Sequence, residues 1–189
     1  MIADAPPPSA FAAAGAGSTL MEVCNLVKTF PGRAGWFGKG TTIRAVDNVS
    51  FRVMAGETFG LVGESGSGKT TTGRCILRLI EPTSGTVTFG ATDLVSLSAR
   101  RLREARRHFQ IVFQDPYSSL NPRMRAGEIV QEPLVIHNIG TPTSRPARAR
   151  ALFDLVGLDR SAISKFPHEF SGGQRQRIGL ARALERDKA

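Results

Sequence analysis

Gly63-Glu64-Ser65-Gly66-Ser67-Gly68-Lys69-Thr70 decides the fold, because this stretch fits the P-loop pattern G-x-x-x-x-G-K-[ST]. Residues 58–62, just before it, form an apolar run that predicts a buried strand. Residues 71–80, just after it, carry the apolar spacing of a helix. Strand, glycine-rich loop and helix in this order are the context that the pattern requires. The stretch therefore predicts a phosphate-binding loop.

The residue types of this loop suit the phosphates of a nucleotide. Glycines let the backbone turn so that successive N–H groups and the positive end of the next helix point at an anion. Lys69 can carry its charge to the β and γ phosphates, and the Thr70 hydroxyl can ligate the accompanying Mg²⁺. A glycine-rich turn before an ordinary helix is the alternative. The candidate binding residues here are Gly63, Glu64, Ser65, Gly66, Ser67, Gly68, Lys69, Thr70 and Thr71.

Length and composition are those of a globular chain with one sizeable domain. The 189 residues are 41% hydrophobic and 22% charged, and no apolar run approaches the roughly 20 residues that cross a bilayer. The net charge of +9 suits nucleic acid, anionic lipid or nucleotides and does not choose among them. Cys24 and Cys75 have no metal or redox spacing, so we expect buried, reduced thiols in a cytosolic protein.

Hydrophobic patterning predicts the order of the elements around the loop. Residues 1–19 are rich in Ala, Pro, Gly and Ser, and we expect a disordered tail. Alternation or apolar runs predict a strand at 20–30, a strand pair at 43–53, a short strand at 86–89 and a strand at 108–114. Residues 100–107 form a basic helix, and helical spacing at 126–158, interrupted at Gly140, predicts a helical subdomain.

A second candidate anion site stands near the end of the chain, at Ser171-Gly172-Gly173-Gln174. Ser171 is a good N-cap for the helical run at 178–184, and the two glycines leave the backbone amides uncovered. Serine and glycine open many helices, so an ordinary helix start is the alternative for this stretch alone.

Together with the P-loop, residues 170–174 resemble the signature motif of the ATP-binding subunits of ABC transporters, with Phe170 where many members have Leu. Gln114 resembles the Q-loop glutamine of that family. Phe30 stands where the family has an aromatic that stacks on adenine, although an aromatic at a strand end can also be a core residue.

Two further stretches, 113–124 and 167–171, are similar to the oligopeptide and dipeptide importer branch of this family. The likeness covers residues 20–184, and Ser67 stands where that branch often has Cys. It implies an α/β fold: a P-loop NTPase (RecA-like) core with an N-terminal antiparallel β subdomain and an inserted helical subdomain. The implied divisions of this partial ATP-binding domain are a β subdomain and core at 20–115, a helical subdomain at 116–170 and a signature helix at 171–186.

The resemblance also implies how such a subunit works. ATP held by Lys69 and Thr70 of one subunit would be closed over by Ser171 and Gly173 of a second ATP-binding subunit, in a head-to-tail dimer. Thr70 and Gln114 would hold Mg²⁺, and Gln174 completes the closing motif. Transmembrane permease subunits would be the other partners, which implies a peripheral position on the cytoplasmic face of the inner membrane.

Members of this family continue after the signature helix into an apolar strand ending in Asp-Glu, which this sequence does not contain. The aspartate would help to hold Mg²⁺ and the glutamate would polarise the attacking water. His168 and Asp187 stand in the wrong context to replace family residues. We therefore expect a C-terminally truncated domain that binds ATP with little or no sustained hydrolysis, and its catalytic residues stay unknown.

Two other functions remain open on the sequence. An ABC ATPase of translation or DNA repair usually carries two cassettes or a large insert, and neither is present. A basic nucleic-acid-binding module could be built on residues 100–107 and 145–150, but only one Trp and one Tyr are available to stack on bases, so we expect no nucleic-acid partner. The transported solute cannot be named, because other subunits would select it.

Overall fold

The computed structural model describes residues 17–32, 41–113 and 119–184, and the predicted tail lies almost wholly outside them. The chain divides into two compact units, an N-terminal unit (Met1–His108) and a C-terminal unit (Phe109–Ala189). Each unit has buried hydrophobic residues of its own.

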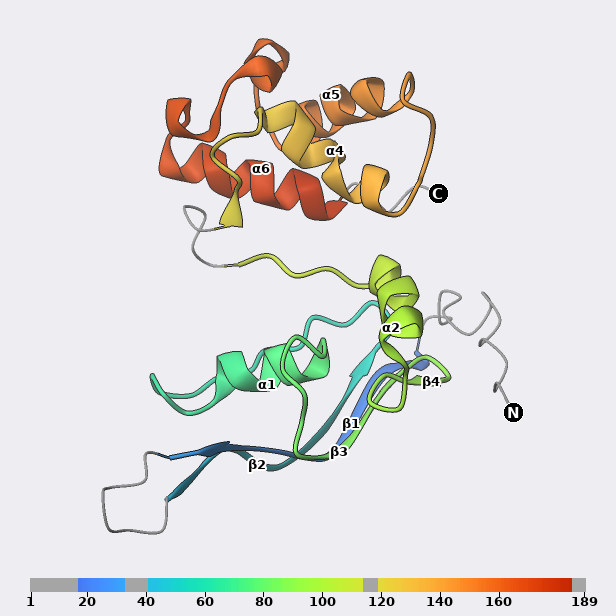
Figure 1. Ribbon diagram of the computed structural model, residues 1–189, viewed down its shortest axis with the longest axis vertical. Coiled ribbons are helices and arrows are strands. Elements are labelled where there is room, and N and C mark those ends of the chain that lie inside the picture. The colour runs from blue at the N-terminus through green and yellow to red at the C-terminus, as the bar shows by residue number, and fades with distance from the viewer. Residues whose placement is uncertain (1–16, 33–40, 114–118, 185–189) are drawn as a thin grey trace. The chain divides into compact units, whose positions relative to one another are not determined.

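An antiparallel sheet forms the N-terminal unit (Figure 1). Its strands, in the order β2-β1-β3-β4, are β1 (Thr19–Pro31), β2 (Thr42–Met54), β3 (Ser84–Phe89) and β4 (Thr92–Asp93). The strands predicted at 20–30 and 86–89 are confirmed. The predicted strand pair at 43–53 is wrong, because β2 runs through it as one strand that pairs along β1.

The pairing of β1 with β2 is irregular at one point that matters for the site. Lys28 pairs with Val46, whereas the next residue, Thr29, pairs with Arg44. Ala45 is therefore an extra residue on β2, which is the arrangement of a β-bulge. A bulge turns the backbone groups of the extra residue away from the ladder.

The described part of the N-terminal unit also contains the short helices α1 (Lys69–Ile76), α2 (Ala99–Ala105) and η2 (Arg106–His108). α1 packs on the sheet through the fully buried Cys75, and burial raises the pKa of this thiol. The helix is shorter than the predicted 71–80, since Arg78 takes a left-handed conformation (φ 46°). Its guanidinium donates to the carbonyl oxygens of Leu94 and Leu97, at 2.8 and 2.6 Å.

Two predicted strands are wrong. Residues 58–62 and 109–113 form no strand, and Phe59 and Val62 are 41% and 91% exposed. A strand needs a neighbour with which to share backbone hydrogen bonds, and neither segment has such a neighbour within the described ranges. An apolar run alone does not supply that neighbour.

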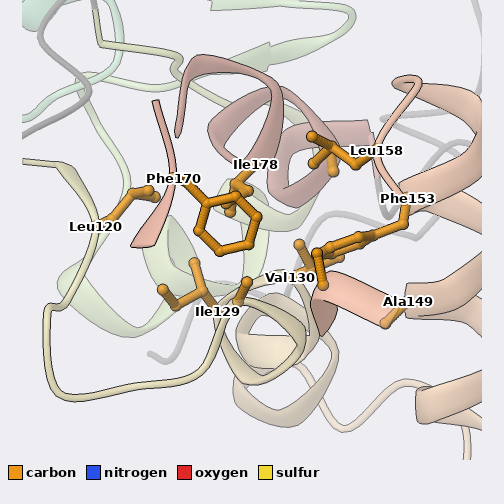
Figure 2. Packing of buried hydrophobic residues seen from close by; sticks show 11 residues of the cluster. Leu120, Ile129, Val130, Ala149, Phe153, Leu158, Phe170 and Ile178 are labelled. Carbon is orange, nitrogen blue, oxygen red and sulfur yellow. The ribbon is translucent and has the colours of Figure 1, made fainter. Parts of the chain in front are cut away.

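Helices build the C-terminal unit: α4 (Ala126–Ile136), α5 (Arg145–Leu155), η3 (Arg160–Ser164), η4 (Pro167–Glu169) and α6 (Gly172–Leu184). The helices predicted within 126–158 and at 178–184 are confirmed. Figure 2 shows their shared core, in which Ile129 and Val130 of α4 meet Phe153 of α5 and Ile178 of α6.

Three arginines of α6 tie this helix to the loops around it. Arg175 donates to the carbonyl oxygen of Pro167 at 2.7 Å, and Arg177 to that of Gly157 at 3.0 Å. Arg182, partly buried, donates to the carbonyl oxygen of Ser119 at 2.9 Å. The Arg175 bond fixes the N-terminal end of α6 against the turn that precedes it, and the other two bonds hold the helix further along its length.

Among the described residues no helix is long and apolar enough to cross a membrane. Cys24 and Cys75 are both free thiols; Cys75 is buried as predicted, whereas Cys24 is only partly buried.

Candidate nucleotide-binding site

The predicted P-loop leads directly into α1, as its pattern requires. Gly68 is the N-cap of this helix and has φ 91°, and Gly66 has φ 84°. Both values lie in the left-handed region, which glycine enters without steric cost. The residues of the loop are exposed from Gly63 to Ser67, so the first amides of α1 open toward solvent.

The Lys69 ammonium lies across the mouth of this loop. Its Nζ atom donates to the carbonyl oxygens of Gly63 and Glu64, at 2.6 and 2.5 Å, and is 3.3 Å from the Ser67 hydroxyl. Lysine has three donors and no acceptor, so these contacts hold the positive charge inside the loop without neutralising it. The arrangement concentrates one positive charge and several backbone amides in one concave turn, which attracts an anion.

The threonines after Lys69 have different environments. Thr72 is buried, and its hydroxyl donates to the Gly68 carbonyl oxygen at 3.0 Å. Thr70 is exposed, and its hydroxyl makes no hydrogen bond to any described residue. A hydroxyl oxygen is a suitable ligand for Mg²⁺, which usually completes its shell with phosphate oxygens and water. Thr70 therefore fits the predicted metal role.

The loop is fixed to the sheet at the bulge of β2. A side chain at Gly68 would overlap the carbonyl oxygen of Ala45, so the two backbones touch at this point. Ala45 was not among the predicted site residues. Its role comes from the register between two strands, which the sequence of one strand does not reveal.

Phe30 lies close to this contact. It pairs directly with Ile43 across the β1–β2 ladder, and Ile43 is two residues from Ala45. The spacing between paired strands and the rise along a strand together place Phe30 about 10 Å from Gly68. This distance is comparable with the length of a nucleoside diphosphate. Phe30 is half-buried and Ile43 is 59% exposed, so apolar surface is available beside the loop.

The second candidate anion site lies in the C-terminal unit, at the start of α6. Ser171 caps this helix as predicted: its Oγ accepts from the Gln174 N–H at 3.3 Å, and the Gln174 Oε1 accepts from the Ser171 N–H at 2.9 Å. Nothing lies within 4 Å of the position where Gly173 would carry a side chain. The glycine face of this helix start is therefore open.

A shallow surface depression of about 600 Å³ adjoins the open glycine. It is lined by Gly173, Gln176, Arg177 and Leu180 of α6 together with Val112 and Phe113. The depression leaves room beside the helix start for a ligand or a partner, and its lining offers both apolar and cationic groups.

Gln114 lies outside the described residues, so its predicted role stays a prediction. The structure brings Phe30 and the P-loop together in the N-terminal unit, and it holds Ser171–Gln174 in the C-terminal unit. The described residues contain no cluster of three or more His, Cys, Asp or Glu side chains that could hold a metal.

Comparison with known proteins decides the family. The family model described as ABC transporter matches residues 46–189, which include both the P-loop and the α6 motif. The chain belongs to the ABC transporter family. This assignment confirms the resemblance and the P-loop NTPase fold.

Relatives of this ABC chain include import proteins. It is 52% identical over 165 residues to a putative peptide import ATP-binding protein of Brucella ovis, covering 87% of this chain and 50% of that protein. It is 48% identical over 168 residues to the oligopeptide transport ATP-binding protein AppF of Bacillus subtilis, covering 88% and 51%. The chain thus spans about half the length of these curated relatives.

A solved ATP-binding cassette, the dimeric MJ0796 bound to ADP and Pi, has a similar structure. The TM-score is 0.76 at 32% identity, and the match covers 88% of this chain and 70% of the cassette. The site of this ABC chain is therefore set in a fold that holds a nucleotide in a solved relative.

Proposed function

We propose that this chain supplies the nucleotide-binding part of the energy-coupling subunit of an ABC importer for peptides or similar solutes. The observation that carries the proposal is the Lys69 ammonium, held across a loop of left-handed glycines at the start of α1. The similarity to peptide import ATP-binding proteins supports the class of solute.

In this proposal ATP binds with its phosphates in the loop and its base on Phe30. The amides of Gly66 to Thr71 and the Lys69 ammonium contact the phosphate oxygens, and Thr70 supplies a hydroxyl oxygen to Mg²⁺. Mg²⁺ neutralises phosphate charge when bound. Gln114 is proposed as a second metal ligand on the family resemblance alone.

The open start of α6 is proposed to serve a nucleotide held by another subunit. Its amides and the exposed Ser171 belong to a unit separate from the P-loop, and a phosphate supplied by a partner would satisfy them. The dimer of the solved cassette is a precedent for such a partner. Permease subunits at the cytoplasmic membrane face would then receive the closing motion.

Binding calorimetry with MgATP tests the proposal through Lys69→Ala. A hydrogen bond from a charged donor contributes about 1.5–3 kcal/mol to binding. Its loss in Lys69→Ala should therefore weaken MgATP binding by about 10- to 100-fold. The matched control is Lys165→Ala, which removes an exposed lysine from the C-terminal unit and should leave affinity unchanged. Equal affinity of wild type and Lys69→Ala would overturn the assignment.

Two arginines of the alternative nucleic-acid surface have structural partners. Arg145 donates to the carbonyl oxygens of Ile139 and Gly140, and Arg106 donates to that of Arg78. These contacts give Arg106 and Arg145 a role within the fold and not on a nucleic-acid surface.

A further inference from the structure

The environment of Phe30 contains a cation that neither the sequence patterns nor the family resemblance assigned. The Lys28 Nζ atom lies over the Phe30 ring, 4.9 Å from its centroid. The two residues are separated by one position on β1, so their side chains leave the strand on the same face. The distance is that of a cation–π contact.

Lys28 is held in this position from its other side. Its Nζ atom also donates to the carbonyl oxygen of Glu81 at 2.7 Å. Glu81 belongs to the turn after α1, and this turn is bound to β1 by further hydrogen bonds: Thr83 N–H to the Val27 oxygen at 2.8 Å, and Thr29 N–H to the Thr83 hydroxyl at 3.0 Å. The lysine therefore bridges the aromatic ring and the turn that ends the P-loop helix.

This arrangement has two consequences for a base that stacks on Phe30. One face of the ring is covered by Lys28, so a second ring must use the other face. An ammonium on one face also draws π-electron density toward itself, which makes the opposite face more attractive to an electron-rich purine.

We propose that Lys28 is a positioning residue of the nucleotide site, which fixes the Phe30 ring and polarises it for stacking of a purine base on the face opposite the ammonium. The proposal rests on the proposed function, since it assumes that Phe30 meets the base. Lys28 touches neither the base nor the phosphates. Its effect is confined to ligands that carry a base.

The test compares MgADP with magnesium pyrophosphate, which has the same number of phosphates and no base. Calorimetry of Lys28→Met should show about two- to fivefold weaker binding of MgADP and unchanged binding of pyrophosphate. Lys28→Gln, which keeps a hydrogen-bond donor without the charge, should behave like Lys28→Met. Lys28→Arg, which keeps a cation that stacks well on aromatic rings, should recover the MgADP affinity to within about twofold.

A double-mutant cycle with Phe30 shows whether Lys28 acts through the Phe30 ring or has a general effect on ligand binding. Phe30→Ala should weaken MgADP about fivefold or more, and adding Lys28→Met to it should cause no further loss. Arg44→Met is the matched control, because it removes a cation from the same end of the sheet, where Arg44 pairs with Asp47 at 2.9 Å. This control should bind MgADP like the wild type.

Four results would overturn the role of Lys28: equal loss of MgADP and pyrophosphate in Lys28→Met, wild-type behaviour of Lys28→Gln, additive losses in the double variant, or an equal effect of Arg44→Met. Binding of the same two ligands to Lys69→Ala distinguishes failure of the Lys28 proposal from failure of the proposed function. If Lys69→Ala weakens both ligands while Lys28→Met changes neither, only the Lys28 proposal fails. If Lys69→Ala changes neither ligand, the proposed function fails.

Discussion

Gly68 shows how a single residue couples the P-loop to the sheet. Its φ of 91° is strained for any residue with a side chain, and a Cβ atom there would overlap the Ala45 carbonyl oxygen. The P-loop pattern requires glycine at this position for the phosphates. The structure adds a second requirement, which is contact with the β2 bulge.

Gly68→Ala should therefore destabilise the chain by about 2 kcal/mol or more, as the combined effect of a left-handed alanine and a steric overlap. Urea unfolding followed by circular dichroism measures this change. Gly73→Ala is the control on the same helix, since no atom lies within 4 Å of its Cβ position and its φ is not positive. There the substitution should raise stability by up to about 1 kcal/mol. Equal stability of the two variants would contradict the contact with Ala45.

Among the elements, helix α6 is held in place by hydrogen bonds from its arginine side chains to the carbonyl oxygens of nearby loops. Arg182, like Arg175, is partly buried, and its removal leaves the Ser119 carbonyl oxygen without this charged donor.

Arg182→Met should lower the free energy of unfolding by about 1.5–3 kcal/mol, because a charge-assisted hydrogen bond is lost in a partly buried place. Arg177→Met removes a bond of similar geometry at an exposed position and should cost less than about 1 kcal/mol. Urea unfolding of the two variants provides the comparison. A larger loss in Arg177→Met than in Arg182→Met would show that burial does not control these bonds.

Element type was predictable from sequence wherever periodicity and local signals agreed. The apolar residues of β1 and β3, the helical spacing of α4 and α5, and the Ser171 cap of α6 gave the correct structure. Residues 58–62 misled the prediction because an apolar run does not show whether a partner strand is present.

The motif residues of the candidate site were predictable from the sequence, whereas the residues that hold them in position were not. The pattern names Lys69 and Thr70 by spacing alone. Ala45 and Lys28 escaped prediction, since the first depends on a register shift between two strands and the second on a side chain reaching over its neighbour's ring. A lysine two positions before the aromatic on the same strand was the available signal for Lys28.

At the scale of the whole molecule, the chain carries its two candidate anion-binding motifs in two units. The N-terminal unit holds Phe30 and the P-loop, and the C-terminal unit holds the open start of α6. A net charge of +9 does not by itself select a ligand, because many arginines are bound to carbonyl oxygens within the fold. In the proposed function, specificity for a nucleotide therefore comes from the local geometry of the loop.

Hydrogen exchange of the chain with and without MgATP tests this central claim most directly, since protection reports where the ligand contacts the backbone. We predict slower amide exchange at residues 63–72 and 28–31, with no change at 100–107 and 145–150. Protection confined to the arginine-rich helices, with residues 63–72 unaffected, would contradict the account.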